Sequence, residues 1–206
     1  MVDVRPRTYP SNHSDSVPHR RQRRQEQWGR RSLHFLRADN QRHLENPLKS
    51  DADALVLDLE TVPTAELESA RETVREVVGS GDFKGKKRIV RIHGVSGDKW
   101  YDDLVRVIAG HPDTILPAWA QSDTEMSILD AFLTQMERHE AVETESITLL
   151  PLIEVIAGLM NVASIAQSTP RVSGLMFGAG DYGMDMDHHE PDQEEGNILL
   201  GHRGRA

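Results

Sequence analysis

The chain has 206 residues, of which 37% are apolar and 28% charged, a composition typical of a soluble globular protein and a length that supports one ordinary domain. It contains no cysteine, which excludes disulfides, thiolate metal sites and a cysteine nucleophile. No apolar run approaches the roughly 20 residues that span a bilayer, and the N-terminus lacks the apolar core of a secretory signal. We therefore expect a cytoplasmic protein with no membrane partner.

Charge is distributed unevenly along the chain. The net charge is −9, yet residues 1–31 carry eight arginines against three acidic residues, which leaves −14 on the remainder. An acidic body gives no electrostatic footprint for nucleic acid, because that binding depends on neutralising phosphates. We expect no nucleic-acid partner, a disordered basic arm over 1–29 and an acidic, irregular tail over 186–206. The segment RRQRR at 20–24 leaves contact with another anionic partner as the alternative.

From about residue 30 onward, short apolar runs of β type alternate with longer helical patterns, which is typical of βα units on a parallel sheet. Six runs are predicted as strands, at 32–36, 54–60, 88–93, 114–119, 147–154 and 173–178. Helices are predicted over 64–79, with Thr64 as N-cap, over 124–137, and after Glu154.

Two architectures fit this α/β pattern. The strand spacing is close to that of a (β/α)8 barrel, which usually needs about 250 residues for eight units. Because no convincing strand pattern follows residue 183, the choice lies between an open, doubly wound sheet and a barrel that lacks its last two units. In both, the loops at the carboxyl ends of the strands converge on one edge, where functional side chains gather.

Polar side chains at the predicted strand ends are the candidates for a site at that edge. They are Asp58, Glu60, Arg91, His93, Glu154 and Asp181. Each alone is explained by a helix cap or a surface charge, whereas three acidic strand ends with one arginine favour a hard divalent cation, which prefers carboxylate oxygens. Gly178 and Gly180 predict a sharp turn that leaves room beside Asp181.

Other patterns compete with this interpretation. The cluster DMDHHE, at 185–190, has residue types that suit a transition metal, but it has no periodic scaffold and is predicted to be a solvated tail. The chain has no GxSxG elbow, P-loop or dinucleotide fingerprint. A phosphate-ester hydrolase on an open sheet, with Asp58 as acidic nucleophile, is the alternative from a different enzyme class.

Five segments in order resemble the HpcH/HpaI aldolase and citrate lyase beta subunit family, which includes the malyl-CoA lyases. They are "RRSLHFLRADNQRHLENPLKSDADALVLDLETVPTAELESAR", "VRIHG", "ILPAWAQS", "PLIEVIAGLMNVASIA" and "PRVSGLMFGAGDYG". The resemblance covers about residues 30–185. It implies a (β/α)8 TIM barrel of the phosphoenolpyruvate/pyruvate-binding type, incomplete here, with about six βα units.

The resemblance also implies a carbon–carbon lyase that cleaves a 3-hydroxyacyl-CoA, or a citryl- or malyl-type thioester, into a 2-oxo acid and an acyl-CoA. By the matching motifs, Glu154 and Asp181 would hold Mg²⁺, with Mn²⁺ as a substitute, and Arg91 would bind the substrate carboxylate. Asp58 and Glu60 would contact these site residues rather than the metal or the substrate. The partners implied are the CoA thioester and the 2-oxo acid, and a homo-oligomer if the barrel is completed.

The chain departs from the family pattern in sequence and in length. Thr61 stands where an acidic residue is usual, and Ala118 and Gln121 stand at a lysine and a glutamate position. The family continues through two further strand units. The alternative function is therefore a truncated, catalytically inactive remnant or accessory subunit that keeps the metal and oxo-acid site.

Overall fold

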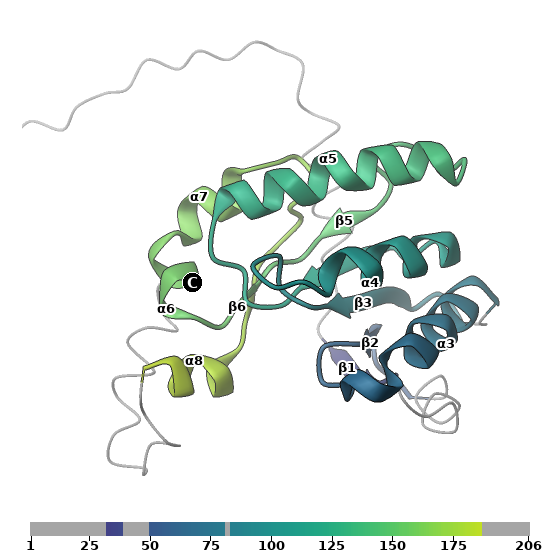
Figure 1. Ribbon diagram of the computed structural model, residues 1–206, viewed down its shortest axis with the longest axis horizontal. Helices are drawn as coiled ribbons and strands as arrows, with labels where there is room; N and C mark the ends of the chain where they lie inside the picture. Colours follow the sequence, from purple (N-terminus) through teal and green to yellow (C-terminus); the bar gives the residue numbers. More distant parts are fainter. Residues whose placement is uncertain (1–31, 39–49, 81–82, 187–206) are drawn as a thin grey trace, which may run out of the picture.

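The structure, a computed structural model, describes residues 32–38, 50–80 and 83–186 (Figure 1). The predicted basic arm lies outside these residues, and so does the predicted tail apart from Met186. Among the described residues no helix has the length and apolar character needed to cross a membrane.

Parallel strands in chain order form the centre of the fold (Figure 1). The five-stranded sheet consists of β1 (Leu33–Arg37), β2 (Ala54–Asp58), β3 (Lys87–Ile92), β4 (Thr114–Pro117) and β5 (Thr148–Leu149). A two-stranded parallel sheet of β6 (Leu152–Ile153) and β7 (Met176–Phe177) follows. An isolated parallel bridge joins Leu149 to Val172. A doubly wound sheet reverses its strand order at a switch point, and the described strands show no such reversal, so that alternative is wrong for this part of the chain.

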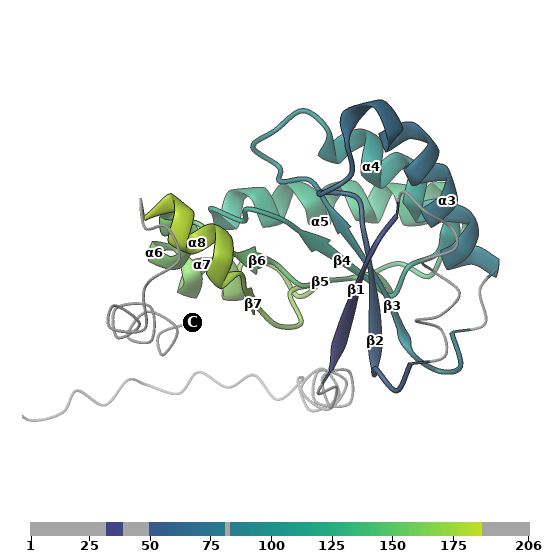
Figure 2. The same ribbon diagram turned by 90° about the horizontal axis from the view of Figure 1, so that it is seen from below.

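Helices lie in most of the connections that the structure describes between strands, and one more follows β7. They are η2 (Thr64–Glu66), α3 (Leu67–Ser80), α4 (Trp100–Val107), η3 (Ile108–Gly110), α5 (Asp123–His139), α6 (Ile156–Met160), α7 (Val162–Gln167) and α8 (Ala179–Asp185). Helices α3, α4 and α5 cover one face of the five-stranded sheet (Figure 2). A capping box in which Ser122 and Glu125 exchange hydrogen bonds fixes the beginning of α5.

Several boundaries differ from the predictions. The predicted strand over 147–154 divides into β5 and β6 around Pro151, which has no amide hydrogen to donate to a ladder. Thr64 is not an N-cap, because Pro63 holds that position and the helix opens with the 3₁₀ turn η2. The sharp turn predicted around Gly180 is instead part of helix α8. Helix α4 was not predicted.

Two cores lie on the two faces of the sheet. Leu55 and Leu57 belong to the outer core under the helices, whereas Ala54 and Val56 belong to an inner core. All five residues of β2 are buried, which is the pattern of a strand covered on both sides.

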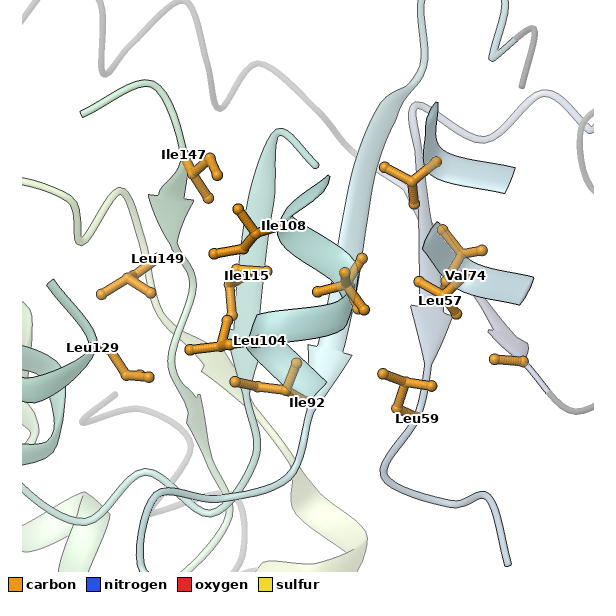
Figure 3. Packing of buried hydrophobic residues seen from close by; sticks show 14 of the residues in the cluster. Leu57, Leu59, Val74, Ile92, Leu104, Ile108, Ile115, Leu129, Ile147 and Leu149 are labelled. Carbon is orange, nitrogen blue, oxygen red and sulfur yellow. The ribbon is translucent and has the colours of Figure 1, made fainter. Parts of the chain in front are cut away.

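The outer core packs α4 and η3 against the strands (Figure 3). Ile92 and Ile115 of the sheet and Leu104 and Ile108 above it are all 0% exposed. Burying a side chain of this size stabilises the fold by about 1.5–3 kcal/mol relative to leaving it in water.

The inner core is partly covered from the two ends of the strand order. Leu33 of β1 and Met176 of β7 both pack against it. The described strands therefore curl toward each other, but β1 pairs only with β2 and β7 only with β6. The barrel is not closed in this part of the chain.

A buried ion-pair network ties α5 to the segment before β7. The Arg171 guanidinium donates to Glu137 Oε1 at 2.8 Å and Oε2 at 2.7 Å, and its Nε donates to Asp130 at 2.5 Å. The side chains of Arg171 and Glu137 are 1% and 0% exposed. Because the carboxylate also accepts the amides of Glu145 and Ile147, the network holds the end of α5 against the start of β5.

Candidate active site

The carboxyl ends of the parallel strands form one edge of the fold, called here the mouth. Asp58 ends β2, Arg91 is the next-to-last residue of β3, and Glu154 directly follows β6. Asp181 lies in the first turn of α8, after β7. The predicted convergence of these residues follows from the parallel order of the strands.

Glu154 and Asp181 form an acid pair at the mouth. Glu154 is 1% exposed, and this burial, with the adjacent Asp181 carboxyl group, raises its pKa to about 8 against the lowering effects of the Trp119 amide and the Arg91 guanidinium. Two carboxyl groups in contact do not both ionise at neutral pH unless a cation compensates them. The pair is therefore a site that either keeps a proton or takes a cation.

Gly178 allows this close approach. A Cβ at Gly178 would lie 2.7 Å from both the Cβ and the Oε2 of Glu154, whereas a Cβ at Gly180 would meet nothing within 4 Å. The room predicted beside Asp181 therefore comes from Gly178, and Gly180 has no steric role in it.

Arg91 is held by groups from β1, from β2 and from the segment after β2. Its Nε and Nη2 donate to the two oxygens of Asp58, both at 2.7 Å, and Nη2 lies 3.3 Å from Glu60 Oε2. The ring of Phe35, on β1, faces the guanidinium with 5.3 Å from Cζ to the ring centroid, a cation–π distance. Parallel register places Asp58 opposite Arg91, so the pair follows from the strand alignment.

Asp58 is saturated with hydrogen bonds. Besides the Arg91 fork it accepts the amide of Glu60 at 3.0 Å and the hydroxyl of Thr61 at 2.5 Å. Burial raises the pKa of Asp58, but the hydrogen bonds from Arg91, Thr61 and Glu60 outweigh it and hold the pKa below its usual value. Thr61 stands where the resemblance predicts an acid, and its hydroxyl donates to Asp58. An ionised acid at this position could not donate this hydrogen bond. With both oxygens engaged, Asp58 is poorly placed to act as the nucleophile of a phosphate-ester hydrolase.

His93 belongs to a different cluster. Its Nδ1 lies 2.7 Å from Asp103 Oδ2, its amide donates to the same oxygen, and Arg71 donates to Oδ1 at 2.8 Å. Asp103 is 0% exposed and lies on α4. His93 therefore ties the end of β3 to the outer helices, and its ring contacts this carboxylate rather than the acid pair.

Trp119 is a member of the mouth that the sequence patterns did not single out. Its amide donates to Glu154 Oε1 at 2.9 Å, and its indole Nε1 donates to Glu60 Oε1 at 3.4 Å. Phe35 was likewise predicted only as part of a strand. The sequence signal for both was weak, since an aromatic residue in or after an apolar strand usually belongs to a core.

The donor set at the mouth fits a hard cation. The acid pair offers oxygen ligands only, and no group of three or more His, Asp or Glu side chains able to hold a metal occurs within 32–38, 50–80 and 83–186. Mg²⁺ is typically held by one or two carboxylates, with its remaining positions taken by water or substrate oxygens. Two adjacent carboxyl groups match that pattern.

Known proteins resemble this chain in sequence. Residues 31–199 match the sequence profile of the HpcH/HpaI aldolase/citrate lyase family. The chain belongs to this family.

Among curated family members, the citrate lyase subunit beta of Leuconostoc mesenteroides subsp. cremoris is 28% identical over 86% of this chain and 60% of its own length. The L-malyl-CoA/beta-methylmalyl-CoA lyase of Cereibacter sphaeroides is 32% identical over 69% of this chain and 46% of its own. The chain thus spans about half the length of these relatives.

A solved structure of the family supports the fold assignment. The citrate lyase beta subunit of M. tuberculosis, complexed with oxaloacetate and magnesium, superposes with a TM-score of 0.66 at 22% identity, covering 84% of this chain and 70% of that one. At this identity the likeness bears on the fold alone. The predicted barrel-type fold, unclosed in the described residues, is confirmed.

Proposed function

We propose that this protein is a Mg²⁺-dependent carbon–carbon lyase that cleaves a CoA thioester of the 3-hydroxyacyl, citryl or malyl type into a 2-oxo acid and an acyl-CoA. The observation that carries the proposal is the pair of the buried Glu154 and the partly buried Asp181, with a pKa of about 8 for Glu154, beside the guanidinium of Arg91. The activities named for the citrate lyase and malyl-CoA lyase relatives support the same reaction class.

Glu154 and Asp181 would hold the cation, for which Mn²⁺ can substitute. When bound, the cation would stabilise the negative charge on the substrate's hydroxyl oxygen as this oxygen loses its proton and becomes the keto oxygen of the 2-oxo acid.

Arg91 would orient the substrate carboxylate. Asp58 and Glu60 occupy Nε and Nη2, which leaves Nη1 as the guanidinium nitrogen available to an incoming carboxylate. The bidentate pair with Asp58 fixes the plane of the guanidinium, and Phe35 supports one of its faces. A substrate would therefore meet a donor whose direction is already set, which lowers the entropy lost on binding.

The first test is metal binding by the purified full chain. Isothermal titration with Mg²⁺ and Mn²⁺ should show binding by the wild type and at least about tenfold weaker binding by Glu154→Gln and by Asp181→Asn, since each removes one ionic ligand. Asp185→Asn is the matched control. Asp185 is an exposed acid in the same helix as Asp181, four residues further on, and its carboxylate accepts a hydrogen bond from the Ile156 amide. Equal affinity in wild type, Glu154→Gln and Asp181→Asn would contradict the site.

The second test is turnover. A screen of 3-hydroxyacyl-CoA thioesters, with and without Mg²⁺, should release a 2-oxo acid and leave the thioester of the product intact. Release of free CoA thiol without a 2-oxo acid would indicate thioester hydrolysis instead. Metal binding with no turnover on any thioester would favour the inactive or accessory role.

A further inference from the structure

Trp119 has a backbone conformation that large side chains rarely adopt. Its φ is 56°, in the left-handed region that favours glycine and is a genuine outlier for a bulky residue. Hydrogen bonds on both sides keep it there: the Ala118 amide donates to Ile92 O and the Ala120 amide donates to Leu152 O, each at 3.1 Å.

Two glycines allow the surrounding chain to close on this segment. A Cβ at Gly94 would lie 2.8 Å from the Ala118 carbonyl oxygen, and one at Gly158 would lie 2.2 Å from the Ala120 carbonyl oxygen. Ala118 and Ala120 are 0% and 1% exposed. The segment is thus enclosed by the loop after β3 on one side and by α6 on the other, and this packing favours the conformation that Trp119 adopts.

The strained turn directs two donors into the mouth. The Trp119 amide bonds Glu154 Oε1 at 2.9 Å, and the indole reaches Glu60 Oε1 at 3.4 Å, at the long end for an N–H···O bond. The other oxygen of Glu60 pairs with Arg91. Trp119 is therefore the residue that joins the acid pair to the guanidinium cluster through hydrogen bonds.

We propose that Trp119 is a positioning residue that holds Glu154 through its amide and Glu60 through its indole. The inference rests on the proposed function and deepens it. By occupying Glu154 Oε1, the amide leaves Oε2, which faces Gly178, as the oxygen for the cation. By holding Glu60 against Arg91, the indole helps to fix the guanidinium that would bind the carboxylate of the 2-oxo acid.

Three variants separate the amide from the indole. Trp119→Gly removes the indole but keeps the amide in place, since glycine adopts positive φ without strain. Trp119→Ile also removes the indole, but a β-branched side chain resists this conformation and pulls the amide away from Glu154. Trp119→Phe keeps one aromatic ring and removes the indole N–H together with the rest of the bicyclic system. Trp100→Phe, in the aromatic cluster with Tyr101 and Phe132, is the matched control.

The first measurement needs no metal. In the metal-free protein the indole N–H resonance of Trp119, assigned by its loss in Trp119→Phe, should shift on Glu60→Gln, while that of Trp100 should not. An unmoved Trp119 resonance would overturn the indole contact.

The second measurement is affinity, with MnCl₂ and with pyruvate in the presence of Mn²⁺. Trp119→Ile should weaken Mn²⁺ binding at least about tenfold, whereas Trp119→Gly and Trp119→Phe should stay within about threefold of the wild type. Trp119→Phe should weaken pyruvate binding about three- to tenfold, the range of one hydrogen bond, and Trp100→Phe should not.

These outcomes separate the inference from the proposed function. If the wild type binds no Mn²⁺, the proposed function fails and the indole resonance alone decides the placement of Trp119. If the wild type binds Mn²⁺ and the glycine and isoleucine variants bind it equally well, the metal site stands and the positioning role of the amide is wrong. Pyruvate binding that is unaffected in Trp119→Phe would overturn the role of the indole.

Discussion

Gly178 is the position where one added methyl group tests the geometry of the acid pair. In Gly178→Ala the new Cβ would lie 2.7 Å from the Cβ and the Oε2 of Glu154, about 0.7 Å inside the 3.4 Å at which ordinary van der Waals contact begins. The carboxylate oxygen can rotate away, but the Glu154 Cβ is fixed to the backbone. The added methyl must therefore push α8, with Asp181, away from Glu154.

The expected magnitude follows from that displacement. Overpacking a buried site by one methyl group costs about 1–3 kcal/mol of unfolding free energy. Ligands of a metal must be held within about 0.5 Å of their productive positions, so a shift of about 0.7 Å exceeds the tolerance. We expect the affinity for Mn²⁺ to fall at least about tenfold.

Gly180→Ala is the matched control for this experiment. It adds the same methyl group in the same helix, where nothing lies within 4 Å, and alanine is favoured over glycine in a helix by about 0.5–1 kcal/mol. Denaturant unfolding and Mn²⁺ titration should show a destabilised, weakly binding Gly178→Ala and a slightly stabilised Gly180→Ala with unchanged affinity. Wild-type affinity in Gly178→Ala, or an equal loss in both variants, would refute the reasoning.

Two further predictions concern buried charge. Arg171→Met should lower the unfolding free energy by about 3–5 kcal/mol, because it leaves the buried Glu137 carboxylate without its cation. Adding Glu137→Gln should restore part of the lost unfolding free energy. A double variant as unstable as the sum of both single changes would contradict this. For Glu154 the folded pKa of about 8 exceeds its ordinary value of 4.5, so its contribution to stability is complete below pH 4.5 and is lost as the pH rises to about 8. In thermal unfolding without metal, the wild type should therefore lose stability relative to Glu154→Gln over this pH window. Saturating Mg²⁺ should remove the difference. Parallel pH profiles of the two proteins would contradict the raised pKa of Glu154.

The local pattern of the chain was enough to predict the parallel strands and most of the main helices, but it left the strand order open between a doubly wound sheet and a barrel. The continuous apolar run in β2 specifies a strand with both faces buried, and the strand spacing specifies parallel βα units. Helix α4 was missed although Trp100, Leu104 and Val107 stand at helical spacing and the last two are buried. The sequence signal for this helix is therefore contained in its own segment.

The sequence by itself determined that Asp58, Arg91, Glu154 and Asp181 reach the mouth, because parallel strands bring their carboxyl ends to one edge. It did not determine what those residues bind there. The pairing of Arg91 with Asp58 joins positions 33 residues apart, and the contact of Trp119 with Glu154 spans 35. Such contacts depend on register, on the glycines that let segments approach, and on the strain that packing imposes on one backbone turn. Only the tertiary structure fixes these, because each arises from the simultaneous placement of several elements and leaves no periodic trace in the chain.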